Sequence, residues 1–537
     1  MPSEPMEFKL GKLRGFVDPE SGQLRYLKVG PYELLRGIYG SVRRPDWGTV
    51  VQTVSDFKFD RKRESFSCTF VAAHKDDKMD FTWHGTITGK VREDGKAEIE
   101  YVLDGTVPVE QMTNRLGLCL LHPATLEGIP AQIEHDPGKI ETIPFPEVIE
   151  ADQPFKDTKA ISYEVKPGIG IRIELSGDDF ETEDQRNYGD ASYKTYCHWQ
   201  ESGSPYRVTK GQEIKQKARL IVSADGYKDE PTIPTASSGQ LPSLGTIFRR
   251  KMTVEEMDHI MSLHLTHSQA SLEGIESAKL VGGPVFLQTQ AASIPVTLSP
   301  NDGILFSPVN QWKKLNAVRG AKKFLAVQGW FMEMNGSKPS FDGLDGSSLG
   351  LQPKTHQFDT DTMMECGWVV PDQVKSARHM GAKTIIVGPA RLSDAPDART
   401  NGIEATLFTM AVIANAVKAK ADFVTLFDSE ALLKSPASLP LALLADRRSN
   451  DIRVWDVNRE FVMIECGKMI LANLSWEPSE YFKQIPFDSA DNLAVGIKGE
   501  YHLFDQDNVA NWKQVLTEPA KHSILSALPP RSIVVLG

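Results

Sequence analysis

The stretch DEPTIPTASSGQLPSLGT, residues 229–246, separates two regions with different sequence patterns. It is dense in Pro, Ser and Gly, a composition typical of loops and of boundaries between folded regions. Before it, short segments rich in β-forming residues follow one another without helical patterns. After it, strand-like and helix-like segments alternate. The stretch therefore predicts a boundary between an all-β region and an α/β region.

The region before this boundary is predicted to be an N-terminal β-sandwich over residues 1–240. Its segments are rich in Val, Ile, Thr, Phe and Tyr, alternate in polarity and are separated by turns such as EDGK. The clearest are TVVQTVSDFKFD (49–60), SFSCTFVAAH (65–74), MDFTWHGTITGKVRE (79–93) and KAEIEYVLDGTV (96–107). Regular short strands without intervening helices favour a large antiparallel sandwich.

Strand–helix alternation predicts a central TIM-like (β/α) barrel over residues 246–450. Helices are expected at VVPDQVKSARHMG (369–381) and ATLFTMAVIANAVKAKA (405–421). An eighth strand is not evident, so a trimmed barrel is also open. The seven candidate strands are SLHLTH (262–267), PVFLQTQ (284–290), GILFSP (303–308), FLAVQGWFMEM (324–334), LGLQPKTHQF (349–358), TIIVGP (384–389) and DFVTLF (422–427).

The last region, residues 451–537, is predicted to be a C-terminal antiparallel β-domain. It returns to alternating segments in DIRVWDVNREFVMIECGKMILANLSWEPSEYF and closes with the apolar LPPRSIVVLG. The whole chain, at 537 residues, is too long for a single core, which agrees with this multidomain division.

Composition narrows the classes of function. A net charge of −11 argues against a nucleic-acid partner, because such partners require a basic face. The run Arg249-Arg250-Lys251 is expected on a solvated face. No signal peptide or membrane span is expected, since the longest apolar-leaning run, ATLFTMAVIANAV, is too short to cross a bilayer. Five scattered cysteines without a C-x-x-C pair predict free thiols, and a cytoplasmic location is expected.

In a TIM-type barrel the reacting groups follow the carboxyl ends of the strands. Carboxylates after two such strands could face each other, one as proton donor and one as base or nucleophile, and a histidine could carry protons between them. The candidates are Glu333 and Asn335 after the fourth predicted strand, His356 and Asp359 after the fifth, and Asp428, Ser429 and Glu430 after the seventh.

Motifs for other chemistries are missing from the sequence. His264 and His267 are three residues apart, so on a strand they would point to opposite faces and would not share a metal. There is no H-E-x-x-H, Walker A loop, G-x-S-x-G elbow or G-x-G-x-x-G after a strand. No metal or organic cofactor is predicted.

The segment FETEDQRNYGDASYKTY (180–196) combines many charged residues with four aromatic ones. Its charges could simply pair with one another along an exposed edge strand. Alternatively, Glu183, Arg186, Asn187 and Asp190 could lie near the barrel mouth and bind a polyhydroxylated ligand or lock a domain interface. Both interpretations are open from the residues alone.

Together with LLRGIYGSVRRPDWGTV (34–50), GLCLLHPATLEGIPAQIEHDPG (117–138) and FPEVIEADQPF (145–155), this segment resembles the D-apionate lactonase family. Further matching pieces are MEMNGSKP, KTHQFDTDTMMEC, VTLFDSE, ILANLSWEP and FDQDNV. The resemblance implies a β-domain, a TIM barrel and a second β-domain. It also implies hydrolysis of a small sugar-acid lactone, of the D-apionolactone type in apiose catabolism, without a metal or organic cofactor.

Glu333 and His356 match positions of that family, and the resemblance implies that one is the base and the other the acid or orienting partner. The chain departs from the family pattern at AVQGW, at Gly336 and at Asp428, where a glutamate is expected. Two alternatives therefore stay open: a glycoside hydrolase with paired carboxylates, and a non-catalytic carbohydrate-binding relic. The oligomeric state is not predicted.

Overall fold

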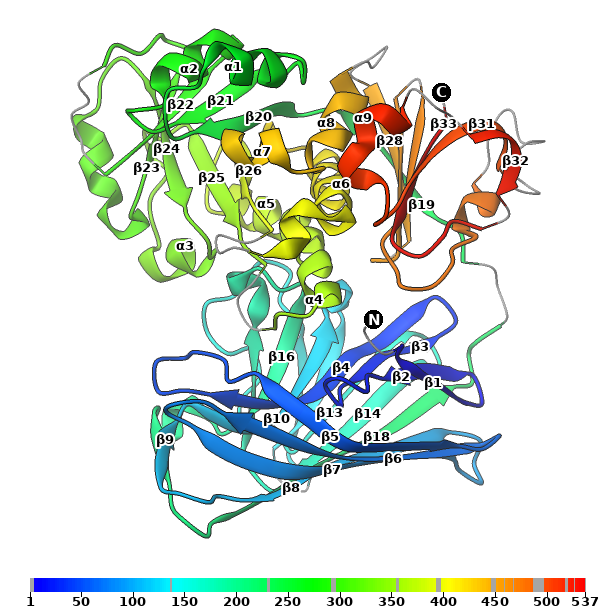
Figure 1. The fold of residues 1–537 in the computed structure, drawn as a ribbon. Coiled ribbons are helices and arrows are strands. Elements are labelled where there is room, and N and C mark those ends of the chain that lie inside the picture. Colours follow the sequence, from blue (N-terminus) through cyan, green and yellow to red (C-terminus); the bar gives the residue numbers. More distant parts are fainter. Residues whose placement is uncertain are drawn as a thin grey trace. The chain divides into compact units, whose positions relative to one another are not determined.

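The computed structural model of the chain describes residues 4–135, 138–228, 232–290, 296–353, 357–392, 397–445, 451–457, 459–466, 468–485, 497–516, 520–525 and 527–536. The chain forms two compact units. The first contains residues 1–185 and 192–230, and the second contains residues 186–191 and 231–537. Each unit is described below by itself (Figure 1).

The first unit is built from two large antiparallel sheets. One has seven strands in the order β1 (Met6–Leu10), β2 (Leu13–Val17), β3 (Leu24–Val29), β4 (Tyr32–Arg43), β10 (Arg115–Pro123), β16 (Ser192–Cys197) and β15 (Phe180–Asp184). The other has nine, in the order β12 (Ile140–Pro144), β11 (Pro130–Glu134), β13 (Ala160–Lys166), β14 (Ile169–Ser176), β18 (Glu213–Ala224), β8 (Ala97–Thr106), β7 (Asp80–Val91), β6 (Ser65–Lys75) and β5 (Gln52–Arg61). A small pair, β17 (Tyr206–Val208) and β9 (Gln111–Thr113), completes the unit.

The two large sheets share one apolar core, with Trp83 and Phe81 of β7 among its fully buried side chains. On β7 every second side chain is buried, the period-2 pattern that the sequence predicted for MDFTWHGTITGKVRE. Several antiparallel sheets are therefore confirmed. All five cysteines of the chain are free and buried.

A polar network lies inside this core around His122 of β10. His122 Nδ1 is 2.9 Å from the Tyr163 hydroxyl, which donates to the Leu34 carbonyl at 2.8 Å. His122 Nε2 is 2.8 Å from the Thr195 hydroxyl, which lies 2.7 Å from that of Thr182. Complete burial lowers the pKa of His122 to about 3, so the ring is neutral at pH 7 and bridges the two sheets.

Acid is expected to destabilise this unit through its buried histidines. Burial lowers the pKa of His74 to about 4 and that of His122 to about 3, whereas both exceed 6 in the unfolded chain. The unfolded state therefore binds more protons, and stability is lost as the pH falls below about 6.5. The expected loss between pH 7 and pH 5 is about 2 kcal/mol per histidine.

Urea unfolding at the two pH values measures this loss. Glutamine is neutral at both pH values. In His122→Gln, the loss of unfolding free energy between pH 7 and pH 5 should therefore be about half that of the parent chain, because only His74 still contributes. The same replacement at the exposed His84 of β7 is the control and should leave the loss unchanged. An equal loss in the parent chain and in His122→Gln would show that protonation of His122 does not contribute to the acid-induced loss of stability.

The second unit contains a closed barrel of eight parallel strands. They are β20 (Ser243–Phe248), β21 (His267–Ala270), β22 (Val285–Thr289), β23 (Gly303–Phe306), β24 (Lys322–Val327), β25 (Gly346–Leu351), β26 (Thr384–Ala390) and β27 (Phe423–Asp428). The helices of the second unit are α1 (Val254–Met261), α2 (Ile275–Val281), α3 (Met332–Ser337), α4 (Thr360–Glu365), α5 (Val370–His379), α6 (Ile403–Lys418), α7 (Ser429–Lys434), α8 (Ser438–Ala445) and α9 (Trp512–Val515).

The barrel is complete because of a strand that the sequence did not predict. Strand β20 begins inside the Pro-, Ser- and Gly-rich stretch 229–246, ends two residues after it, and pairs with both β21 and β27. A glycine is required at position 245 of this strand, because a Cβ there would come within 2.5 Å of the His267 ring inside the barrel. The glycine that permits this close approach also weakens the strand pattern in the sequence.

A third antiparallel sheet follows the barrel in the second unit. Its strands are β19 (Thr235–Gln240), β28 (Asp451–Val457), β29 (Phe461–Glu465), β30 (Met469–Asn473), β33 (Ser532–Leu536), β31 (Ile497–Phe504) and β32 (Ala520–Leu525). Residues 235–240 were predicted to belong to the N-terminal region, but they pair with β28.

Helix α6 is buried on nearly all sides because it contacts barrel strand β27 and also β19, β28, β29, β30 and β33 of the third sheet (Figure 1). This confirms the helix predicted at residues 405–421. Within the described ranges, no helix has both the length and the apolar content needed to cross a membrane.

Candidate functional site at the barrel mouth

Parallel barrel strands bring their carboxyl ends to one rim, and Asp428 stands on it as the last residue of β27. Its Oδ2 accepts a hydrogen bond from Arg249 Nε at 3.0 Å, and its Oδ1 lies 3.8 Å from an Arg391 terminal nitrogen. Arg249 directly follows β20 and Arg391 directly follows β26, the two strands that flank β27 in the barrel. Three adjacent strands thus place one carboxylate between two guanidinium groups.

The Asp428 carboxylate is only half satisfied. Its Oδ1 is buried, yet it accepts no hydrogen bond from the described residues, because the distance to Arg391 exceeds that of a hydrogen bond. Buried acceptors are almost always paired in native proteins. This oxygen is therefore suited to accept a hydrogen bond from a ligand hydroxyl or a water molecule.

Glu333 lies in the first turn of α3, and not at the end of a strand as the sequence analysis expected. Strand β24 stops at Val327, and Glu333 Oε1 accepts the backbone N–H groups of Gln328, Gly329 and Trp330 at 3.2, 3.4 and 3.5 Å. These amides fix one carboxylate oxygen. The other oxygen, Oε2, makes no hydrogen bond or ion pair with the described residues.

Two other predicted site residues, Asp359 and Glu430, bind neighbouring groups of the protein. Asp359 caps α4, accepting the Thr362 backbone N–H at 3.0 Å, and lies well beyond β25, which ends at Leu351. Glu430 pairs with Arg250, which also binds Glu256 at 2.8 Å. His356 lies outside the described residues.

The segment Arg186–Ala191, from the middle of FETEDQRNYGDASYKTY, belongs to the second unit. Asn335 Nδ2 donates to Asn187 Oδ1 at 2.8 Å, so two predicted site residues contact each other directly. Arg186 is fully buried and pairs with Asp372 of α5 at 3.3 Å. The Cys366 thiol lies 3.8 Å from Asp190 Oδ1.

Glu183 belongs to the first unit and binds Arg115 of β10 and Gln200. Glu181, two residues earlier, also binds Arg115, at 2.7 Å. Arg115 and Glu181 are each 1% exposed and Glu183 is 15% exposed. These charges therefore pair within a buried network, and not along an exposed edge.

The ion pairs of two arginines at the rim were not predicted. The run Arg249-Arg250-Lys251 was expected on a solvated face, and Arg249 is indeed exposed, but Arg249 also pairs with Asp428 and Arg250 with Glu430 at the end of the neighbouring β27. The separation of Arg249 from Asp428 by 179 positions left no local signal. Inside the barrel, Gln269 donates to Thr425 at 2.9 Å, and the buried His267 lies 2.9 Å from the same hydroxyl.

Burial lowers the pKa of His267 to about 3, so this histidine is a neutral interior residue. Within the described ranges, no group of three or more His, Cys, Asp or Glu side chains could hold a metal ion.

Residues 1–225 match the family model for the N-terminal domain of D-apionate lactonase. This match confirms, for that part of the chain, the resemblance in the sequence. A curated D-apionate lactonase from Brucella anthropi is 33% identical over 256 residues, covering 46% of this chain and 41% of that protein. The match thus spans about two fifths of the length of the curated relative.

Solved structures give weaker likenesses. A galactose mutarotase-like protein from Lactobacillus casei is 10% identical with a TM-score of 0.27, covering 41% of this chain and 100% of that chain. A xyloglucanase of glycoside hydrolase family 44 from Paenibacillus polymyxa is 9% identical with a TM-score of 0.34, covering 56% and 97%. At these TM-scores neither structure is used to infer the fold or the function of this chain.

Proposed function

We propose that the protein is a lactonase-type hydrolase that opens a small sugar-acid lactone, of the D-apionolactone type, at the mouth of a TIM-like barrel. The observation that carries the proposal is Asp428, which is held between Arg249 and Arg391 and has one oxygen that accepts no hydrogen bond from the described residues. The matches to D-apionate lactonase support the same class of reaction.

The proposed chemistry assigns a task to each candidate residue. Glu333, with Oε1 fixed by three amides, uses Oε2 to take a proton from the attacking water. Arg391 or Arg249 stabilises the negative charge that forms on the carbonyl oxygen as water adds. The ring C–O bond then breaks, and the ring oxygen receives a proton from an acid, for which His356 is the proposed residue. The product is the ring-opened hydroxy acid.

Specificity is proposed to come from hydrogen bonds to the hydroxyl groups of the substrate. Asp428 Oδ1 accepts one of them, since it has an unused lone pair. Asn335, fixed by its bond to Asn187, together with Arg186, Asp190, Asp359, Glu183 and Glu430, is proposed to bind substrate or to position the residues that do. No cofactor is assigned to the reaction.

A substrate panel tests this function. The full chain is incubated with aldonolactones, D-apionolactone included, and acid release is followed by pH-stat titration against the spontaneous rate. We expect acceleration on at least one lactone. A parallel panel of nitrophenyl glycosides tests the paired-carboxylate alternative: turnover there without lactone hydrolysis would favour a glycoside hydrolase. Binding without turnover on either panel would favour a non-catalytic relic.

A further inference from the structure

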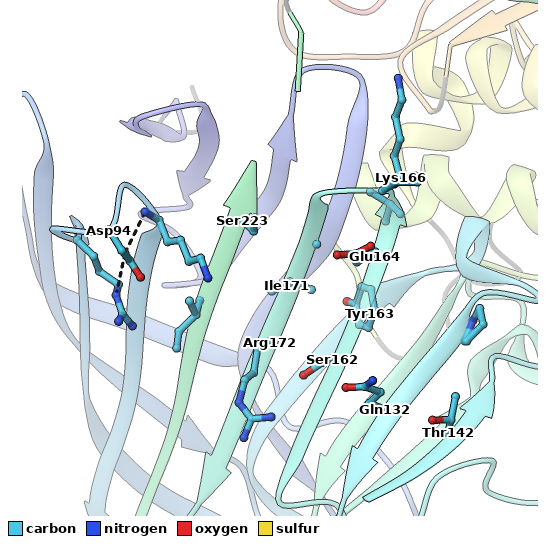
Figure 2. A pocket seen from close by; sticks show the side chains of 17 residues that line it. Asp94, Gln132, Thr142, Ser162, Tyr163, Glu164, Lys166, Ile171, Arg172 and Ser223 are labelled. Atoms are coloured by element: carbon cyan, nitrogen blue, oxygen red, sulfur yellow. Dashed lines mark hydrogen bonds and ion pairs between the residues drawn. The ribbon is translucent and has the colours of Figure 1, made fainter. Parts of the chain in front are cut away.

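The outer face of the nine-stranded sheet carries a hollow that the proposed function does not use. It has a volume of about 770 Å³ and is lined by residues of β11, β12, β13, β14 and β18 and of the β7–β8 turn (Figure 2). Four cations line it, Arg92, Lys96, Lys166 and Arg172, against the two carboxylates Asp94 and Glu164. In a chain with a net charge of −11, this is a local excess of positive charge.

A row of polar side chains crosses the hollow at a single register. Thr142 is paired with Gln132, Gln132 with Ser162, and Ser162 with Arg172, on four neighbouring strands. Direct cross-strand partners project from the same face of a sheet, about 4.8 Å apart. The row therefore spans about 14 Å, and Figure 2 shows these four side chains following one another across the strands.

The first three members of the row have unused hydrogen-bonding groups. The side chains of Thr142, Gln132 and Ser162 bind no other described residue. Hydroxyl and amide groups both donate and accept, which suits the hydroxyl groups of a carbohydrate. Their spacing lets one extended ligand contact all three.

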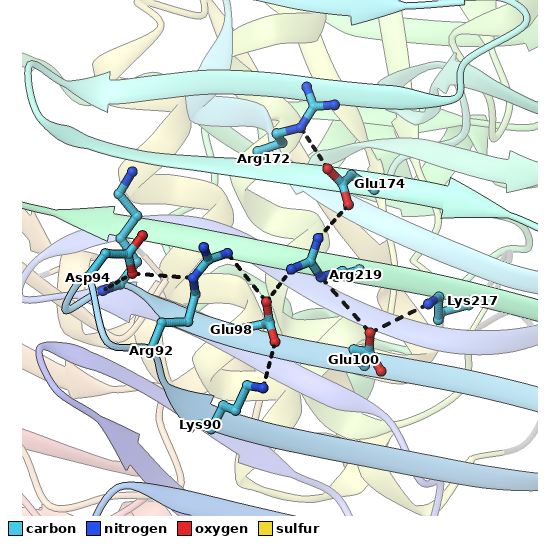
Figure 3. Close-up of polar contacts among 10 residues, drawn as sticks. Lys90, Arg92, Asp94, Glu98, Glu100, Arg172, Glu174, Lys217 and Arg219 are labelled. Atoms are coloured by element: carbon cyan, nitrogen blue, oxygen red, sulfur yellow. Dashed lines mark hydrogen bonds and ion pairs between the residues drawn. The ribbon is translucent and has the colours of Figure 1, made fainter. Parts of the chain in front are cut away.

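The arginine at the end of the row is held in place by two glutamates. Arg172 Nε donates to Glu174 at 3.0 Å and one terminal nitrogen donates to Glu134 at 2.7 Å; within the described chain, its other terminal nitrogen has no partner. Glu174 also accepts from Arg219 at 3.0 Å, and Arg219 binds Glu98 in a ladder across the sheet (Figure 3). The ladder fixes the guanidinium orientation before any ligand arrives, which lowers the entropy lost on binding.

One cation of the hollow lacks a carboxylate partner. Lys96, next to the β7–β8 turn, forms no ion pair with the described residues, and Lys166 Nζ donates to the Tyr32 hydroxyl at 2.8 Å. Cations that are not neutralised by neighbouring acids attract anions most strongly. The hollow thus contains side chains that can hydrogen-bond to hydroxyl groups and a lysine, Lys96, that no described carboxylate neutralises.

We propose that this hollow is a binding site for an anionic carbohydrate, a short sugar chain that carries carboxylate groups. Thr142, Gln132 and Ser162 bind its hydroxyl groups, and Arg172 and Lys96 bind its carboxylates. The site is separate from the proposed reaction, because all its residues belong to the nine-stranded sheet and its turns.

Calorimetric titration of the full chain tests this site with two matched probes, linear trigalacturonate and its neutral methyl ester. No lactone is present, so the result is independent of activity at the barrel mouth. We expect the acid to bind at least tenfold more tightly than the ester, and its affinity to fall as salt rises from 50 to 300 mM. Absence of heat at millimolar acid, or equal affinities for acid and ester, would overturn the proposal.

Variants locate the binding. Arg172→Gln and Lys96→Gln should each weaken trigalacturonate binding at least fivefold, and Ser162→Tyr, which fills the middle of the row without changing charge, should abolish it. Lys215→Gln is the control: Lys215 is an exposed cation of β18, paired with Asp104 at 3.0 Å and outside the hollow. If Lys215→Gln weakens binding as much as Lys96→Gln does, the attraction is non-specific and the proposal fails. Circular dichroism confirms that each variant is folded.

Discussion

Replacing Glu333 with glutamine is expected to lower kcat for lactone hydrolysis by about 10²–10⁴-fold, the usual contribution of a general base. The amide oxygen of glutamine can still accept the N–H groups of Gln328, Gly329 and Trp330, so the turn before α3 should keep its geometry. What is lost is the second carboxylate oxygen, which is proposed to take the proton from water. Steady-state kinetics on the best lactone of the panel measures the effect.

Glu276→Gln is the matched control, because Glu276 also lies in the first turn of a short barrel helix, α2, but is exposed. It should leave kcat within about twofold. Substrate affinity separates the possible roles of Glu333: a base affects kcat and leaves KM nearly unchanged, whereas a binding residue raises KM. A Glu333→Gln enzyme with full kcat would remove Glu333 from the mechanism.

Strand and helix types were predictable where hydrophobic periodicity decides them. Alternation identified β5, β6, β7 and β8 of the nine-stranded sheet, and a continuous apolar run identified α6. Strand β20 was missed because Gly245 serves a tertiary contact with His267, which interrupts the local pattern. Glu333 was misplaced for a related reason. The strand-like run 324–334 is broken at residues 328–330 by a turn whose amides bind the Glu333 side chain itself.

The candidate site was predictable in part. A carboxylate after the last barrel strand follows from topology, and Asp428 was found this way. Its two arginine neighbours could not be found, because Arg249 becomes adjacent only when β20 pairs with β27 and closes the barrel. The same limit applies to Asn187 and Asn335, which are 148 positions apart and in direct contact. Side-chain pairings across a closed barrel leave no periodic trace in the sequence.

Replacing Arg115 with methionine is expected to destabilise the first unit by about 3–5 kcal/mol, because it leaves the carboxylates of Glu181 and Glu183 without their cation. Burial raises the pKa of Glu181, and Arg115 opposes this shift. Without the arginine the pKa rises further. The destabilisation should therefore be smaller at pH 5 than at pH 8, since a protonated Glu181 no longer carries an unpaired charge.

Hydrogen exchange of β10 and β16 under urea, read by mass spectrometry, follows this unit separately from the rest of the chain. Arg219→Met is the control: Arg219 pairs with three glutamates but is 31% exposed, so its loss should be about 1 kcal/mol or less. Adding Glu181→Gln to Arg115→Met should recover part of the stability, because it removes one of the two stranded charges. A loss for Arg115→Met no larger than that for Arg219→Met would mean that water or another cation already satisfies the two glutamates. In that case the ion pairs of Glu181 and Glu183 with Arg115 would not stabilise the segment FETEDQ, which leads to Arg186.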